Sequence, residues 1–358
     1  MKLATIALAI LAAHSTASWA QSSVTLYGIV DVGLRFTTNS GSASDPGASL
    51  KQVVPGGMSN SRLGVNVAED LGGGLKALVN LEHRLNSDTG AQAAGEFWRQ
   101  AWVGVESSDF GRVALGRQYN VLFDLYTGTY SSFKYSPYIE AFRPETVMVL
   151  GGRQSNMVKY VGQTGGLRFA AQASAGEGTS VDKSLGGYLR YEDSGLAVGG
   201  GYLEASEVSG AKAKAMTVGV GYAAGPLYVN AAWGRNDFDR AAVTLQALFT
   251  ANYTVSPGSK LGGRALDVRH RDMFSAGLTY QLTNELNLGV QGWYAKQTHH
   301  LVSGNSTAAF GAVVADYALS KRTDLYAEMD YSRLGGSLTY DNGRTSRLGL
   351  MTGVRHRF

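Results

Sequence analysis

The chain has no cysteine, few prolines and no long apolar run after its first twenty residues. Without cysteine there can be no disulfide framework and no thiolate zinc site. Because no later stretch stays apolar for about 18 residues, the sequence does not predict a transmembrane helix. The formal net charge of +4 is mild, whereas proteins that bind nucleic acid show a basic patch or stripe. We therefore expect no nucleic-acid partner.

The short motifs of common enzyme classes are also missing. The sequence contains no G-x-S-x-G elbow, no P-loop and no H-E-x-x-H pair. The three glycines at 72–74 are turn residues, because no βαβ unit surrounds them. We expect no enzyme activity, no cofactor and no metal site.

The first twenty residues have the pattern of a secretory signal peptide. Lys2 precedes an apolar run over residues 3–13, and small residues flank Trp19 at Ser18 and Ala20. A positive start, a short apolar centre and a small-residue cleavage site define such a signal. We therefore predict a signal peptide at 1–20 and a single domain at 21–358.

Alternation of apolar and polar residues dominates the remaining chain and indicates strands with one face buried. In 324–331, apolar residues occupy the odd positions, and Asp324, Glu328 and Asp330 occupy even ones. The same pattern recurs at 24–36, 62–67, 75–84, 167–172, 216–222, 227–233, 286–291 and 347–358. These segments approach the roughly ten residues that a tilted strand needs to cross a bilayer. Their polar face suits a water-filled lumen.

The connectors predict how many strands there are. Seven short turns stand out, at 69–74, 107–111, 163–166, 192–195, 223–226, 282–285 and 319–323. Eight longer polar stretches alternate with them, at about 37–60, 86–96, 118–152, 175–184, 203–214, 236–270, 295–308 and 332–346. Short turns at one end and long loops at the other are typical of transmembrane barrels. We predict an all-β, sixteen-stranded antiparallel transmembrane β-barrel, with Leu26, Leu63, Val79, Leu325 and Val354 facing lipid.

Ordered motifs along the chain resemble the β-proteobacterial branch of the Gram-negative trimeric general porins. They are SVTLYG at 23–28, SRLG at 61–64, EDLGGGLKA at 69–77, RQAWVG at 99–104, LGRQY at 115–119, SKRTDLY at 320–326 and GVRHRF at 353–358. The resemblance implies a homotrimer in the outer membrane, in contact with its lipid and lipopolysaccharide. It also implies an inward-folded third loop and passive diffusion of small hydrophilic solutes and ions. The terminal Phe358 should close the barrel beside Leu26–Val32.

Basic side chains on the luminal face would set the ion preference, because arginine or lysine rings favour anions. Arg62, Arg153 and Lys159 fall on the luminal parity of their segments. The resemblance, rather than the parity, places Arg99 in the lumen. Arg117 shares the parity of its apolar neighbours and needs a bulge or a strand end to turn inward.

Acidic side chains of the third loop should form the opposing wall, and the candidates are Asp124, Glu140 and Glu145. These acids could instead face bulk water or pair with Lys134 and Arg143. The porin branch often has an acidic Pro-Glu-Phe-like segment here, whereas this chain reads YSPYIEAFRPE at 135–145.

The leading functional hypothesis is a passive channel with a weak preference for anions. A second hypothesis is a substrate-specific channel whose arginine cluster binds one anion, such as phosphate or a dicarboxylate. A third is a barrel that acts mainly as an adhesin through its outer loops.

Overall fold

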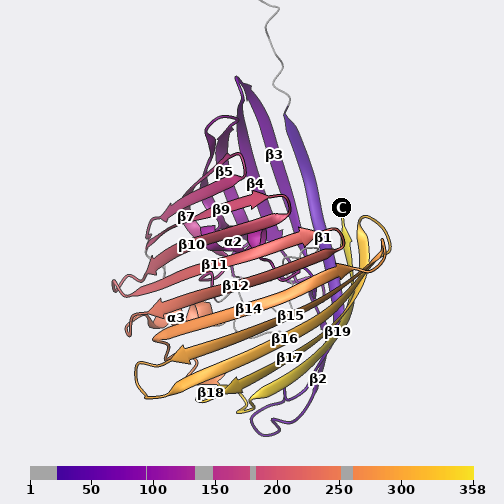
Figure 1. Ribbon diagram of the computed structural model, residues 1–358, viewed down its shortest axis with the longest axis vertical. Coiled ribbons are helices and arrows are strands. Elements are labelled where there is room, and N and C mark those ends of the chain that lie inside the picture. Colours follow the sequence, from indigo (N-terminus) through magenta and orange to yellow (C-terminus); the bar gives the residue numbers. More distant parts are fainter. Residues whose placement is uncertain (1–21, 94, 134–147, 178–182, 251–260) are drawn as a thin grey trace, which may run out of the picture.

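The computed structural model describes residues 22–93, 95–133, 148–177, 183–250 and 261–358 (Figure 1). The predicted signal peptide at 1–20 lies outside these residues. The main sheet contains β1 (Ser23–Thr37), β2 (Leu50–Val54), β3 (Arg62–Gly72), β4 (Leu75–Arg84), β5 (Trp98–Ser107), β6 (Gly111–Tyr119), β7 (Arg153–Thr164), β8 (Leu167–Ser174), β9 (Lys183–Asp193), β10 (Leu196–Ser206), β11 (Lys212–Ala224), β12 (Leu227–Phe238), β14 (His270–Gln281), β15 (Leu286–Thr298), β16 (Asn305–Ala318), β17 (Thr323–Gly335) and β19 (Ser346–Arg357). Two helices, α2 (Val121–Thr129) and α3 (Val243–Thr250), lie in loops. The short strands β13 (Leu261–Gly263) and β18 (Leu338–Tyr340) pair with each other.

Two of the seventeen strands in the main sheet are halves of one barrel strand. The C-terminal part of β1, Gly33–Thr37, pairs with β2, and its N-terminal part, Ser23–Ile29, pairs with β3. Residues 55–61 interrupt the strand between them. The barrel therefore has sixteen antiparallel strands, as the connectors predicted. The expected first loop at 37–60 was wrong in part, because β2 forms within it.

Pairing of the first and last strands closes the sheet. Nine consecutive residues of β1, from Ile29 to Thr37, face β19. The backbone N–H of Gly28 donates to the carbonyl of Phe358 at 3.0 Å, and the N–H of Phe358 donates to the carbonyl of Gly28 at 3.1 Å. Closure beside the first strand is thereby confirmed. A closed ladder leaves no edge to be solvated, which hydrocarbon requires.

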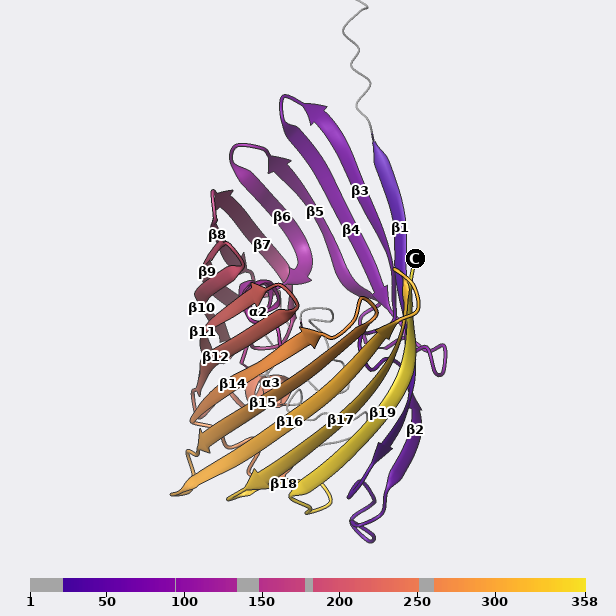
Figure 2. The ribbon, with the colours of Figure 1, turned by 45° about the vertical axis from the view of Figure 1, so that its right-hand side comes forward.

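The two faces of the barrel differ as the alternation predicted. Leu26 and Val354 are 61% and 45% exposed on the outer face. Asp31 and Arg355, on the opposite parity, are fully buried inside. The long loops gather at one end and the seven short turns at the other (Figures 1 and 2). No helix in the described part of the chain is long and apolar enough to cross a membrane.

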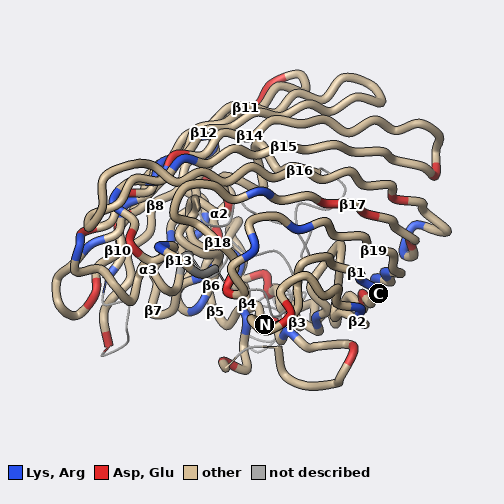
Figure 3. Tube along the Cα trace, turned by 90° about the horizontal axis from the view of Figure 1, so that it is seen from below, with Lys and Arg blue, Asp and Glu red and all other residues tan. Residues whose placement is uncertain are grey.

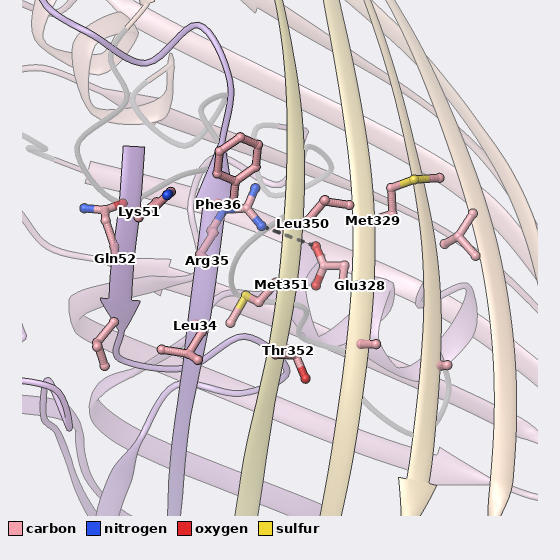
Figure 4. A pocket seen from close by; sticks show the side chains of 14 residues that line it. Leu34, Arg35, Phe36, Lys51, Gln52, Glu328, Met329, Leu350, Met351 and Thr352 are labelled. Carbon is pink, nitrogen blue, oxygen red and sulfur yellow. Dashed lines mark ion pairs between the residues drawn. The ribbon is translucent and has the colours of Figure 1, made fainter. Parts of the chain in front are cut away.

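An apolar groove of about 890 Å³ lies on the outer face of β1, β2, β16, β17 and β19 (Figure 4). Leu34, Val53 and Leu350 line it, and all three are exposed. The ion pair between Arg35 and Glu328 appears beside the groove in Figure 4 but belongs to the inner face, where both side chains are buried. The groove is therefore separate from the lumen.

We expect deletion of Phe358 to lower the yield of folded barrel. The deletion removes both hydrogen bonds to Gly28 and the aromatic ring that covers this glycine on the outer face. Each lost hydrogen bond costs about 0.5–1.5 kcal/mol. The measurement is the heat-modifiable fraction on a gel after refolding, with Phe358→Tyr as the control that keeps the ring. An unchanged folded fraction after the deletion would contradict the closure argument.

Candidate channel constriction

Helix α2 starts the third loop and lies inside the barrel, against β8–β11 (Figure 2). The side chain of Asn120 caps the helix by accepting the N–H of Phe123 at 2.8 Å. The first helical N–H, from Val121, donates to the side-chain oxygen of Gln172 on β8 at 2.7 Å. These two bonds fix the start of the helix to the inner wall.

Glycines on the inner face of the wall let the helix approach closely. A Cβ added at Gly201 would lie 2.8 Å from the side chain of Leu122, and one at Gly199 would lie 2.7 Å from Leu125. A Cβ at Gly219 would overlap the ring of Tyr130 just after the helix. Glycine inside a strand often marks such a close approach. The run of glycines in β10 and β11 is therefore the seat of the third loop.

The described part of the loop then follows the inner wall across further strands. The carbonyl of Ser131 accepts the hydroxyl of Tyr228 at 2.9 Å, and that of Ser132 accepts the side-chain amide of Asn230 at 3.3 Å. The returning chain is held by Asn120, whose amide donates to the carbonyl of Val149 at 2.9 Å. The described part of the third loop is thus folded inward, as the resemblance implied.

Three arginines meet on the inner wall beside the start of the third loop. The guanidinium carbons of Arg99 and Arg153 lie 5.8 Å and 5.3 Å from the centre of the Tyr119 ring. Glu82 is a shared partner, 3.4 Å from Arg99 and 3.8 Å from Arg62. The arginines come from β3, β5 and β7, which are the second, fourth and sixth barrel strands. We call Arg62, Arg99 and Arg153 the arginine cluster.

A local irregularity explains why Arg99 faces inward. Residues 101, 103 and 105 of β5 share its parity and face outward. The ladder with β4 shifts register between Glu82 and His83, which pair with Gln100 and Trp98. Arg99 is the extra residue of this bulge, and a bulge re-aims the side chain. The parity of the sequence alone could not show it.

Arg62 is positioned by the inward segment at 55–61. The carboxylate of Asp31 accepts the N–H groups of Met58 and Ser59 at 3.1 and 2.7 Å, together with the Tyr326 hydroxyl at 2.7 Å. This buried carboxylate holds the segment against the wall. Arg62 follows directly, and its Nε donates to the carbonyl of Asn60 at 3.0 Å.

The structure adds Arg84, which the sequence reasoning did not single out. Arg84 pairs directly with Arg62 in the β3–β4 ladder and therefore points to the same side of the sheet. In the sequence, Arg84 alternates in phase with Asn80 and Glu82, and this pattern already indicated that its side chain faces the lumen. Two arginines opposite each other place further positive charge at this level of the wall.

Two predicted positions differ from expectation. Arg117 pairs with Ala101 on the outward parity, donates to Ser155 at 2.8 Å and lies 3.6 Å from Glu96. It does not join the cluster. The register shift between β6 and β7 places the extra residue on β7, so the side chains of β6 keep their alternation and Arg117 keeps its outward direction. Asp124 was expected on the opposing wall but binds Lys159 at 2.7 Å.

The remaining acidic residues have mixed outcomes. Glu140 and Glu145 lie outside the described residues. The luminal acids of β16 and β17 are paired with Arg35 of β1 and Arg355 of β19. Acidic residues are visible along β17 in Figure 3. Asp330 binds Arg35 at 2.6 Å, and Asp324 binds Arg355 at 2.9 Å. These acids therefore brace the wall across β1, β17 and β19.

A closed barrel with an apolar outer face, a charged interior and an inserted loop defines a transmembrane channel. The chain belongs to the Gram-negative porin family, whose family model matches residues 4–337. It is accordingly a channel of the outer membrane and not an enzyme.

Relatives of known sequence span the whole chain. An outer membrane porin protein of Bordetella pertussis is 26% identical, with all of both chains covered. Outer membrane porin protein 32 of Delftia acidovorans is 29% identical, again over the full length of both.

Solved structures with the same fold include the anion-selective porin from Comamonas acidovorans. Its TM-score is 0.75 at 24% identity, and the match covers 94% of this chain and all of that one. OmpT of Vibrio cholerae in its trimer form has a TM-score of 0.66 at 16% identity, covering 94% and 99% of the two chains. These matches support the sixteen-stranded architecture.

We expect Gly219→Ala to displace the third loop from its seat. The added methyl group would overlap the Tyr130 ring, whose hydroxyl also contacts Thr217 at 2.6 Å. Single-channel conductance should become larger or more variable, because the loop no longer lies flat on the wall. Gly311→Ala is the matched control, since its methyl group would meet only Gln291 at 3.9 Å. Identical conductance in both variants would show that this glycine does not seat the loop.

Proposed function

We propose that the chain is a diffusion channel for small hydrophilic solutes and ions with a weak anion preference, and that the arginine cluster is its filter. The observation that carries the proposal is the convergence of three arginines from alternate barrel strands. Arg99 and Arg153 lie over the Tyr119 ring, and Arg62 joins Arg99 through Glu82. Guanidinium groups stay protonated at any working pH. The cluster therefore supplies permanent positive charges at one level of the wall.

The inward position of the third loop makes these charges effective. Ions in solution screen a charge over about 8 Å at physiological salt. A wall charge therefore matters where the passage is comparably narrow, and low-dielectric walls focus its field. The described loop residues occupy the wall of β8–β12, and α2 lies next to the cluster, because its Phe123 ring stacks on the Tyr119 ring at 4.6 Å. A solute that passes the narrowed level of the lumen therefore stays within reach of the arginines.

Lys159 and Arg117 are given different roles in this proposal. Lys159 is luminal but already bound to Asp124, so we assign it to holding α2 rather than to selecting ions. Arg117 on the outer side has no part in the filter. The anion-selective description of the similar Comamonas porin supports the sign of the preference.

We infer that the chain assembles as a homotrimer. The trimer form of the similar Vibrio OmpT supports this assembly. Cross-linking of the folded protein in detergent, followed by mass measurement, tests it. A purely monomeric folded channel would contradict the inference.

We expect replacement of Arg62, Arg99 and Arg153 by glutamine to lower the anion preference at low salt. The change should be smaller at 1 M salt, where the screening length falls to about 3 Å. The measurement is the reversal potential in matched salt gradients. A lysine variant at the same three positions keeps the charges and should keep most of the preference.

Arg117→Gln is the matched control, because it removes one positive charge from the outer side. Its reversal potential should equal that of the unmodified channel. If the triple glutamine variant also keeps the original permeability ratio at low salt, the cluster is not the filter.

A further inference from the structure

A second basic site lies on the inner wall between the arginine cluster and the end of the barrel that carries the short turns. It is a hollow of about 420 Å³ bounded by β5–β9 and the last turn of α2. Arg112, Lys159, Arg168 and Arg190 line it together with Tyr188. Arg112 and Arg168 each lie one residue into a strand that starts at a short turn, whereas the cluster arginines lie at the opposite ends of their strands.

Two of these arginines face each other directly. Arg168 on β8 pairs with Arg190 on β9 in the strand ladder. Like charges in directly opposed positions are destabilising. Arg190 is compensated, because it binds Glu192 at 2.5 Å and donates to the Gly128 carbonyl of α2 at 3.0 Å. Among the described residues, Arg168 makes one hydrogen bond, from its Nε to the Tyr188 hydroxyl oxygen at 3.2 Å.

Arg112 completes the arrangement from β6. Its guanidinium lies 5.2 Å from the centre of the Trp102 ring. Glu106 is its direct neighbour in the β5–β6 ladder, but no ion pair joins them. Within the described part of the chain, neither Arg112 nor Arg168 forms an ion pair with an acid.

The two acids that line the hollow are already occupied. Asp124 binds Lys159 at 2.7 Å, and Glu192 binds Arg190. Two guanidinium groups with free donors therefore face one water-accessible hollow. The Tyr188 hydroxyl accepts from Arg168, so its own proton is left to donate. Planar guanidinium donors match the oxygens of phosphate and carboxylate groups.

We propose that this hollow binds a small oxyanion, either an inorganic phosphate or a solute that carries a phosphate or carboxylate group. The anion would accept from Arg112, Arg168 and the Tyr188 hydroxyl, and it would relieve the repulsion between Arg168 and Arg190. The proposal deepens the proposed function, because the anion must reach the lumen through the channel. A solute that has passed the arginine cluster meets this hollow next.

The test is single-channel current in potassium chloride at neutral pH, with inorganic phosphate added at increasing concentration. The unmodified channel should show a saturable fall in chloride current. Arg168→Gln should weaken the apparent phosphate affinity by about tenfold, and Arg168→Lys by less, because a charge is kept without the planar fork.

Lys76→Gln is the matched control. It removes one positive charge from the luminal face of β4 at the same end of the barrel, outside the hollow. Its phosphate affinity should stay unchanged. If Lys76→Gln and Arg168→Gln weaken the apparent phosphate affinity equally, the effect comes from the general positive charge of the lumen, and the proposal of a specific site is wrong. An unmodified channel without saturation would overturn it as well.

The same currents separate this site from the filter. If the triple glutamine variant of the cluster loses phosphate saturation while Arg168→Gln keeps it, the anion binds at the cluster and the hollow is not a site. If the triple variant keeps the permeability ratio while Arg168→Gln still weakens phosphate, the filter proposal fails and the hollow stands.

Discussion

The pairing of β1 with β19 is the contact on which the rest of the molecule depends. In hydrocarbon, an unpaired backbone N–H or carbonyl costs several kcal/mol, and an open sheet has a whole row of them. Nine residue pairs from Ile29–Arg357 to Thr37–Gly349 remove that row. Closure also gives every strand one face toward the lumen and one face toward lipid. The charged side chains of the lumen can exist because alternate residues then point away from lipid.

Much of this architecture is readable from the sequence because it follows from local rules. A lipid-facing strand must alternate, so the apolar positions of 324–331 predict both a strand and its orientation. Turn residues and polar loops predict the strand count. The interruption at 55–61 was not predictable, because its Gly-rich composition resembles a loop and its inward fold depends on Asp31, far away in the sequence. The bulge at Arg99 and the outward direction of Arg117 depend on pairing with neighbouring strands, which parity within one segment does not contain.

Charged residues of the interior fall into two regions of the wall, one with paired acids and one that is mainly basic. Acids of β16 and β17 are held by Arg35 and Arg355 across β1, β16, β17 and β19, so the charges of that part of the wall are paired. Buried ion pairs of this kind contribute little net stability but are costly to break singly. Positive charge collects on the strands from β3 to β9 instead. The glycine seat of the third loop lies between these regions, and it sets how close a solute must come to the basic wall.

The interrupted second strand has a consequence for how such chains can vary in length. Seven residues, 55–61, lie opposite three residues of β1, 30–32, so the strand carries four extra residues. Four is an even number, and the alternation stays in phase across the break, with Val54 and Arg62 both on the inner side. Insertions and deletions here should therefore occur in steps of two, which segment lengths among relatives would reveal. A step of one residue would turn Arg62 toward lipid, where an arginine costs about 2–4 kcal/mol at the bilayer midplane.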